Sequence, residues 1–380
     1  MVRDTTFRGR TSMVGFVERR GQSFFLNGQA FRMAGANVYY LGFVNRPTIE
    51  AILDQTIAMG LNVLRIWGFC EQTDSDFYFH YFNQERGVPD VKDGPDGLAR
   101  LDQAIFLAEQ RGVRLIVPLA NYWPAFGGMD AYCNWFALGS RDQFYRDGRC
   151  RAWYWQWVEQ LLLRKNPLTQ RTYAEEPAIL AWELANEPRC ENADGSPIED
   201  GEDVLVSWIW EMATLIRSRD FNHLISVGDE GFLHHQQMGN NSLFNGVHGA
   251  SYERFLGVGP VDFGTFHMYE QMAGGGNLRD FGRMWIREHV ASSARANKPA
   301  VLEEYGARIG QSGIGNADDR AALYRDWLQD VSDLGANGAL VWMLGLPKGP
   351  DQPFDPDPYV IGGDAPEAAA IRDFARAFST

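Results

Sequence analysis

The sequence predicts a (β/α)8 barrel, and three observations carry that prediction. Short apolar runs alternate with longer amphipathic stretches along most of the chain, a pattern typical of α/β proteins. Eight of the apolar runs are rich in β-branched or aromatic residues and end at turn residues. The 380 residues contain no internal repeat and no Pro/Ser-rich linker. We therefore expect one catalytic domain over residues 1–380, with a flexible N-terminus over residues 1–14.

The eight apolar runs are expected to form the barrel strands. They are Arg32–Tyr40, Asn62–Phe69, Val113–Asn121, Ala178–Pro188, Leu224–Glu230, Phe263–Glu270, Pro299–Gly306 and Gly338–Gly345. Helical periodicity between or after them predicts Thr48–Met59, Leu98–Arg111, Val204–Arg217, Leu278–Ala296, Ala317–Leu334 and Ala365–Phe378. Eight strands alternating with helices favour a closed parallel barrel over an open sheet.

A β-hairpin is expected before the first barrel strand. Two short runs within Gly15–Arg32 flank Asn27-Gly28, and Asn-Gly is a strong signal for a two-residue hairpin turn. We expect this hairpin to close the N-terminal end of the barrel. Long connections follow strands two, three, five and eight, and in this fold the loops after strands build the active face.

Composition excludes several classes of function. The chain carries 49 acidic and 35 basic residues, a net charge of −14, which disfavours nucleic acid as a partner. No run of 18 apolar residues is present, so no membrane-spanning helix is expected. The four cysteines form no CxxC pair, which argues against zinc and thioredoxin chemistry, and a disulfide between Cys133 and Cys150 stays open. Aromatic residues make up 13% of the chain, and we expect some to line a sugar-binding cleft.

Carboxylates at two strand ends are the main candidates for chemistry. Strand four ends in Trp182-Glu183-Leu184-Ala185-Asn186-Glu187, and strand seven in Leu302-Glu303-Glu304-Tyr305-Gly306. An unpaired charge in such an apolar run costs roughly 2–5 kcal/mol, so these groups need partners or a purpose. Carboxylates on strands four and seven can face each other across the barrel mouth. Retaining glycoside hydrolysis requires such a pair, one neutral and one ionised, about 5–5.5 Å apart.

The alternation of side chains along a strand sorts the neighbouring residues. His267 and Tyr269 share one face of strand six, and Arg65 shares a face with Val63 and Trp67. Arg65 needs a carboxylate partner, and Glu304 is the natural one, an arrangement that would keep the pKa of Glu304 low.

Three further residues are assigned by their position along the strands. Glu183 lies deeper in the barrel than Glu187, and we interpret it as an interior partner of Arg65. Glu303 has the opposite parity to Glu304, so parity alone does not choose between them. Trp342 on strand eight is placed to form the floor under a sugar ring.

Several segments resemble endo-β-1,4-mannanases of glycoside hydrolase family 5, within clan A and nearest to subfamily 7. The segments are Leu64-Arg65-Ile66-Trp67-Gly68-Phe69, Asn121-Tyr122-Trp123 with Phe126-Gly127-Gly128, Trp182-Glu183-Leu184-Ala185-Asn186-Glu187-Pro188-Arg189-Cys190, His267-Met268-Tyr269 and Glu303-Glu304-Tyr305-Gly306. The resemblance runs from about Phe25 to Trp342. Asn-Glu-Pro alone recurs across clan A, whereas its combination with Arg-Cys and Asn-Tyr-Trp is specific. Asn121 stands where many relatives carry histidine, which favours the mannanase branch over the cellulases.

The resemblance implies a role for each matching residue. Glu187 would be the acid/base and Glu304 the nucleophile, and Asn186 would bind the sugar 2-hydroxyl. The remaining substrate-binding positions would be Arg65, Trp67, Trp123, Arg189, His267, Tyr269 and Trp342. The expected substrate is β-mannan or manno-oligosaccharides, hydrolysed without metal or organic cofactor and without an obligate protein partner.

Three alternatives stay open. An exo-acting β-mannosidase would use the same chemistry with one end of the cleft blocked by loops. A β-1,4-glucanase would use it on cellulose, and a non-catalytic carbohydrate-binding protein would use the scaffold alone. The first twenty residues lack the apolar segment of a signal peptide. We expect a secreted or periplasmic enzyme whose signal is absent from this chain, with an intracellular location as the alternative.

Overall fold

Eight parallel strands form the centre of the computed structural model, which describes residues 15–71, 76–83, 85–234, 241–346 and 357–378. The strands are β4 (Met33–Asn37), β5 (Val63–Arg65), β8 (Arg114–Pro118), β9 (Ile179–Glu183), β10 (Leu224–Ser226), β11 (Gly264–Tyr269), β12 (Ala300–Gly306) and β13 (Gly338–Val341). Each overlaps a predicted strand, which is confirmed with shorter bounds. The flexible N-terminus predicted over residues 1–14 lies outside the described residues.

The sheet curls into a nearly closed barrel. Its strand order is β10-β9-β8-β5-β4-β13-β12-β11, with every ladder parallel. Backbone hydrogen bonds join the two outer strands, since Asp262 N donates to Ile225 O at 2.7 Å and His267 N donates to Glu230 O at 3.0 Å. The predicted (β/α)8 barrel is therefore confirmed.

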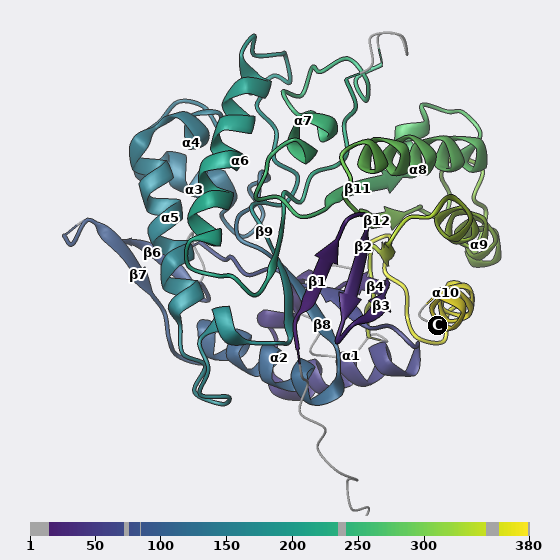
Figure 1. The fold of residues 1–380 in the computed structure, drawn as a ribbon, viewed down its shortest axis with the longest axis horizontal. Helices are drawn as coiled ribbons and strands as arrows, with labels where there is room; N and C mark the ends of the chain where they lie inside the picture. Colours follow the sequence, from purple (N-terminus) through teal and green to yellow (C-terminus); the bar gives the residue numbers. More distant parts are fainter. Residues whose placement is uncertain (1–14, 72–75, 84, 235–240, 347–356, 379–380) are drawn as a thin grey trace, which may run out of the picture.

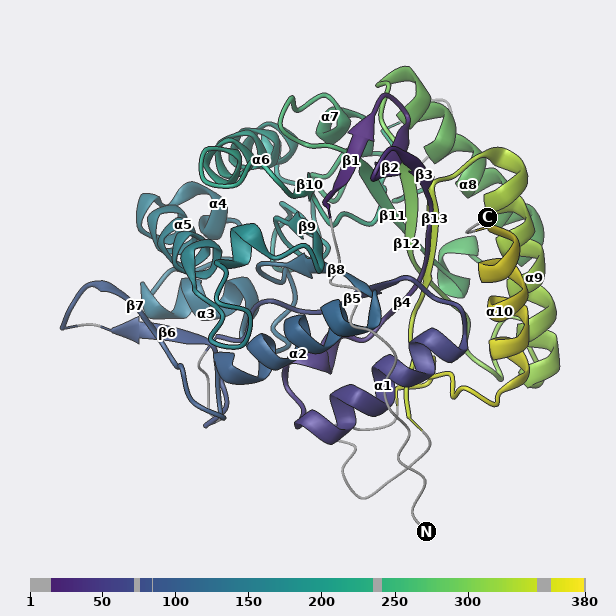
Figure 2. The same cartoon turned by 60° about the horizontal axis from the view of Figure 1, so that its bottom comes forward.

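Helices surround the strands on all sides (Figures 1 and 2). They are α1 (Arg46–Ala58), α2 (Leu98–Arg111), α3 (Gly128–Trp135), α4 (Gln143–Arg146), α5 (Gly148–Leu163), α6 (Gly201–Arg217), α7 (Tyr252–Leu256), α8 (Leu278–Arg295), α9 (Ala317–Leu334) and α10 (Pro366–Phe378), with 3-10 turns at Tyr39–Gly42, Tyr173–Glu175 and Glu270–Ala273. The six predicted helices are confirmed to within a few residues. Within the described residues, no helix is long and apolar enough to cross a membrane.

Two small antiparallel units flank the barrel. β1 (Val17–Arg20), β2 (Ser23–Leu26) and β3 (Gln29–Phe31) lie over the middle of the ring of helices in Figure 1. The turn between β2 and β3 is the predicted Asn27-Gly28, with φ of 52° and 79°. The second unit, β6 (His80–Asn83) and β7 (Val88–Val91), lies in the loop after β5 and projects from the side of the molecule.

The N-terminal end of the barrel interior is apolar. Phe24 of β2 packs edge-on against Phe263, with ring centroids 5.4 Å apart, so the hairpin closes this end as predicted. One separate core cluster fills the space between them, made of Val17, Phe24, Met33, Val63, Ile116, Leu180, Ala181, Leu224, Phe263, Val301 and Leu340. This layer anchors the strands whose opposite ends carry the polar residues described next.

Candidate active site

A cleft of about 800 Å³ opens at the carboxyl ends of the strands. Nine of the ten predicted site residues line it: Trp67, Trp123, Asn186, Glu187, Arg189, His267, Tyr269, Glu304 and Trp342. The tenth, Arg65, is fully buried beneath them. The structure therefore brings together residues from six barrel strands and the loops that follow them, at the end of the barrel where the fold places its active sites.

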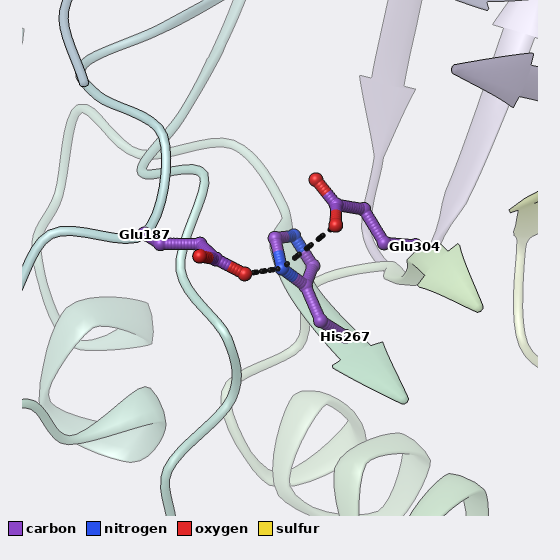
Figure 3. A group of neighbouring side chains, drawn as sticks. All are labelled: Glu187, His267 and Glu304. Atoms are coloured by element: carbon purple, nitrogen blue, oxygen red, sulfur yellow. Dashed lines mark hydrogen bonds and ion pairs between the residues drawn. The ribbon is translucent and has the colours of Figure 1, made fainter. Parts of the chain in front are cut away.

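His267 lies between the two candidate catalytic carboxyls (Figure 3). Its Nδ1 is 2.7 Å from Glu187 Oε1 and 3.5 Å from Glu304 Oε2. One oxygen of Glu187 and one of Glu304 lie within 4.8 Å of each other. This separation is close to the roughly 5–5.5 Å between the carboxyls of retaining glycosidases and shorter than the 6.5–9.5 Å of inverting ones.

Hydrogen bonds orient both carboxyls. Glu187 Oε2 accepts from Trp123 Nε1 at 2.5 Å, and Glu304 Oε2 accepts from the Tyr269 hydroxyl at 2.5 Å. Arg65 Nη1 donates to Glu304 Oε1 at 2.6 Å, which is the contact expected from strand parity. These charge-assisted bonds hold each carboxyl in one orientation toward the cleft.

Arg65, on β5, binds side chains of two other strands, β9 and β12, from the interior of the barrel. Besides Glu304 on β12, its Nε donates to Glu183 Oε2 on β9 at 2.8 Å and its Nη2 donates to Asn186 Oδ1 at 2.8 Å. Glu183 is thus the interior partner of Arg65 that its depth on the strand indicated. Arg65 is fully buried, so hydrogen bonds to these acceptors must replace the water that its charge has lost.

The backbone at Glu187 adopts an uncommon conformation. Its φ is +51°, in the left-handed region that residues other than glycine seldom occupy. Glu187 N donates to Gly228 O at 2.8 Å, which ties this turn to the segment after β10. Gly228 has φ of +82°, and a Cβ there would lie 2.2 Å from Ala185 O, so only glycine allows this close approach. Such local strain is concentrated at functional sites.

An irregularity in β12 turns two successive glutamates inward. The pairing of β11 with β12 shifts between Phe266 and His267, so His267 pairs with Glu304 and Glu303 is skipped. As a result Glu303, like Glu304, reaches Arg65, with Oε2 3.4 Å from Nε. The opposite orientation that parity predicted for Glu303 is therefore wrong, because a β-bulge breaks the alternation of side chains.

The protonation pattern differs from the expected one. Burial lowers the pKa of His267, but the charge of Glu304 and the hydrogen bonds with Glu187 and Glu303 outweigh it and raise the pKa well above its usual value. Burial raises the pKa of Glu187, but the hydrogen bonds and charge of His267 and the bond from Trp123 bring it down to about 2. Both shifts favour the charged form of this pair, with the proton on His267 rather than on Glu187.

The expectation that Arg65 keeps the pKa of Glu304 low is wrong. Burial raises the pKa of Glu304, and the charges of His267 and Arg65 offset only part of that effect. The removal of Glu304 from water, with its side chain only 4% exposed, outweighs the attraction of Arg65.

One wall of the cleft is built around Arg189. Its guanidinium makes a two-pronged bond to Glu230, at 2.6 and 2.7 Å, and lies over the rings of Trp123 and Phe232, each 5.0 Å from the centroid. Burial raises the pKa of Glu230 to about 7, assisted by the charge of Glu187. At the other wall, Trp342 stacks on Tyr39 with ring centroids 5.7 Å apart, and the Trp342–Met343 peptide bond is cis.

Three polar residues of the site were not predicted. Asn37 Nδ2 donates to Glu303 O at 2.8 Å, Asn121 Oδ1 accepts from Asn186 Nδ2 at 3.0 Å, and Glu230 binds Arg189. Each follows or ends a barrel strand, at β4, β8 and β10 respectively. The rule that selected Glu187 and Glu304, polar residues at carboxyl ends of strands, was sufficient to find them.

Sequence comparison decides the family. Residues 14–330 match the family described as glycoside hydrolase family 5, β-mannosidase-like. The chain belongs to glycoside hydrolase family 5. It is therefore an enzyme that hydrolyses glycosidic bonds, and its catalytic machinery is to be sought in the cleft just described. The family assignment leaves the subfamily as a prediction.

Similar proteins cover nearly the whole of this family 5 enzyme. It is 33% identical to mannan endo-1,4-beta-mannosidase A of Podospora anserina over 94% of this chain and 90% of that protein. The crystal structure of the endo-1,4-beta-mannanase of Rhizomucor miehei superposes with a TM-score of 0.86 at 30% identity, covering 96% of this chain and 99% of that one. The endo-beta-1,4-mannanase of Thermotoga petrophila is 38% identical, with a TM-score of 0.84 over 93% and 78% of the two chains.

Proposed function

We propose that this enzyme hydrolyses internal β-1,4-mannosidic bonds in mannan, glucomannan or galactomannan with retention of configuration, using Glu304 as nucleophile and Glu187 as acid/base. The observation that carries the mechanism is the separation of at most 4.8 Å between their carboxylate oxygens, which leaves no room for a water between sugar and nucleophile. The substrate is supported by the similar enzymes from Podospora anserina and Rhizomucor miehei, which are named for this bond.

In the first step Glu304 attacks the anomeric carbon while Glu187 protonates the departing oxygen. The proton that Glu187 needs lies on His267 Nδ1, 2.7 Å away. A sugar in the cleft displaces water and weakens the solvation of the His267–Glu187 ion pair, which favours the neutral pair with the proton on Glu187. Arg65 and Tyr269 aim Glu304 by two hydrogen bonds, and both oppose the effect of burial on its pKa.

In the second step Glu187 takes a proton from water while the water oxygen attacks the anomeric carbon, which breaks the bond from that carbon to Glu304 and releases the carboxylate. The proton returns to the Glu187–His267 pair, so the same hydrogen bond serves both steps. In this proposal Asn186 binds the 2-hydroxyl in the transition state, and its hydrogen bonds with Arg65 and Asn121 support that role by holding its amide in one orientation. Trp67, Trp123, Arg189 and Trp342 line the cleft on either side as sugar-binding surfaces.

Replacement of each carboxylate tests these assignments. Glu304→Ala is expected to lower kcat on mannan on the order of 10⁴-fold, about 5 kcal/mol, without loss of folding. Azide fits the space left by a missing carboxylate, so Glu304→Ala should form an α-mannosyl azide and Glu187→Ala a β-mannosyl azide. Unchanged activity of Glu304→Ala, or the same anomer from both variants, would reject the roles.

A digest of mannohexaose separates the proposed activity from its rivals. Mixed oligosaccharides are the expected products, whereas mannose alone identifies an exo-acting β-mannosidase. Rates on glucomannan and carboxymethylcellulose, measured side by side, distinguish a mannanase from a glucanase. Complete absence of turnover with retained binding of mannan would identify a non-catalytic sugar-binding protein.

We also infer that the enzyme acts outside the cytoplasm, since its proposed substrate is a polymer too large to cross a membrane. Antibody detection in the culture medium or periplasm of the native organism tests this inference. Exclusive recovery from the cytoplasm would contradict it.

A further inference from the structure

Beneath the catalytic pair, two fully buried carboxyls face the same cation. Arg65 Nε lies 2.8 Å from Glu183 Oε2 and 3.4 Å from Glu303 Oε2, and none of the three side chains is exposed to solvent. Ser226 Oγ donates to Glu183 Oε1 at 3.0 Å. Among the described residues, Glu303 Oε1 has no hydrogen-bond partner. Neither Glu183 nor Glu303 lines the cleft, so neither contacts a sugar there.

The charges of this buried cluster do not balance if every carboxyl is ionised. Two cations, Arg65 and His267, face four carboxyls, namely Glu183, Glu187, Glu303 and Glu304. The other titratable groups that act on the cluster are Asp229, Tyr269, Arg189 and Glu230, and the last two neutralise each other. Two surplus negative charges would remain in a largely buried cluster, which is costly. A single proton within the cluster removes one of them.

Glu183 and Glu303 are where such a proton is best accommodated. Both carboxyls contact the same nitrogen, Arg65 Nε, at 2.8 and 3.4 Å, and Glu303 Oε1 has no donor among the described residues. Two ionised carboxylates supply no donor to each other, whereas a proton on either one does. Burial raises the pKa of Glu183 well above its usual value. Burial also raises the pKa of Glu303, but the charges of Arg65 and His267 outweigh it and lower the pKa. Like charges placed this close separate into one neutral and one ionised group, as in other carboxyl pairs.

We propose that Glu183 and Glu303 hold one proton between them and act as a singly charged counter-ion that positions Arg65 and His267 under the catalytic pair. Glu303 Oε2 touches both cations, at 3.4 Å from Arg65 Nε and 3.5 Å from His267 Nε2. A second negative charge here would compete with Glu304 for Arg65. It would also hold the proton more tightly on His267, so that less of it reached Glu187.

Glutamine substitutions test the shared proton, because glutamine has the shape of a neutral glutamic acid. If one charge serves both residues, Glu183→Gln leaves Glu303 ionised and Glu303→Gln leaves Glu183 ionised, so the charge of the cluster is unchanged. Each single variant should keep kcat/KM on mannan within about tenfold, with its pH profile in place. Glu183→Gln/Glu303→Gln removes the last charge, and should lose about 10³-fold, far more than the product of the single losses, with an altered pH profile.

Additive losses would overturn the proposal, as would a pH profile already displaced in both single variants, since both results mean two independent charges. The kinetic test rests on the proposed function, but the two can fail separately. An active Glu304→Ala would reject the catalytic assignment, whatever activities the Glu183→Gln and Glu303→Gln variants show. Infrared difference spectra of wild type against each single variant at pH 7 need no activity and no double variant. A protonated carboxyl band lost in both single variants is expected, and its absence from wild type would equally overturn the proposal.

Discussion

The two ends of the barrel interior are built on the same strands with opposite chemistry. On β5, Val63 lies in the apolar layer and Arg65, two residues on, lies under the cleft. On β9, Ala181 and Glu183 repeat the pattern. Because side chains alternate along a strand, residues two apart share a face, so one inward row changes from apolar to charged within about 7 Å of strand.

The difference separates stability from chemistry along a single axis. The apolar end, closed by β1–β3, requires only burial and close packing. The charged end needs every group to have a partner, and Arg65 supplies one for Glu183, Asn186 and Glu304 together. Substitutions at the apolar end should therefore change stability alone, whereas those at the charged end should change activity and respond to pH.

The largest effect is expected for Arg65→Met. Loss of the buried cation leaves Glu183, Glu303 and Glu304 without their shared partner, which should lower the free energy of unfolding by about 3–5 kcal/mol. Misplacement of Glu304 should lower kcat on the order of 10³-fold, about 4 kcal/mol. Urea unfolding and steady-state kinetics measure the two effects. Arg65→Lys is the matched control, since it keeps the charge but loses the fork that reaches three acceptors. Arg65→Lys should lie between wild type and Arg65→Met in both stability and kcat. Equal losses in the two variants would show that the forked guanidinium group is not needed.

At the apolar end, Phe24→Ala should lower stability without changing catalysis. Phe24 is completely buried between the hairpin and the barrel, and its removal leaves a cavity against Phe263. We expect a loss of about 3–5 kcal/mol in the free energy of unfolding, with kcat unchanged at temperatures where the variant is folded. A kcat lowered tenfold or more in fully folded protein would show that the two ends are not independent.

Titration should distinguish the ends as well. Asp229, at the charged end, is buried, and its burial raises its pKa to about 7 in the folded protein, where His267 only partly compensates. Between pH 4 and pH 7 the folded state keeps a proton that the unfolded state releases, so wild type loses stability as the pH rises. Asp229→Asn does not titrate, and should gain stability over wild type by about 2–4 kcal/mol on going from pH 4 to pH 8. Phe24→Ala should lose the same free energy of unfolding, relative to wild type, at pH 4 and at pH 8. If the difference between Asp229→Asn and wild type is also the same at both pH values, the pKa of Asp229 is not raised.

The sequence was sufficient for the features that follow from periodicity. All eight strands were located because each is an apolar run, and the contact of Arg65 with Glu304 followed from strand parity and the need of a buried arginine for a carboxylate. The strand ends were less well predicted, since the alternating pattern continues into the loops after the hydrogen-bonded ladder stops. Val113–Asn121, for example, contains the shorter β8.

What could not be predicted depends on neighbours distant in the sequence. Glu303 faces inward because the register of β11 against β12 shifts, and no local pattern shows such a shift. The order of the pKa values of Glu187 and Glu304 depends on His267 lying between them, at distances fixed by three strands. Charged residues in an apolar strand segment indicate a site. Which of them carry protons can be worked out only from the coordinates of all their partners.

The smallest effect is expected at the tip of the hairpin, in Gly28→Ala. Gly28 has φ of +79°, and an added Cβ would meet no atom within 4 Å, so the substitution tests backbone conformation alone. The left-handed conformation should cost about 1–2 kcal/mol in the free energy of unfolding, measured in urea, with kcat unchanged. Gly112, at the end of α2, is a matched control, since it has φ of +73° and equally open surroundings. If Gly28→Ala lowered the free energy of unfolding far more than Gly112→Ala, the turn would be needed to position Phe24 in the barrel. The hairpin would then be an integral part of the apolar core at this end.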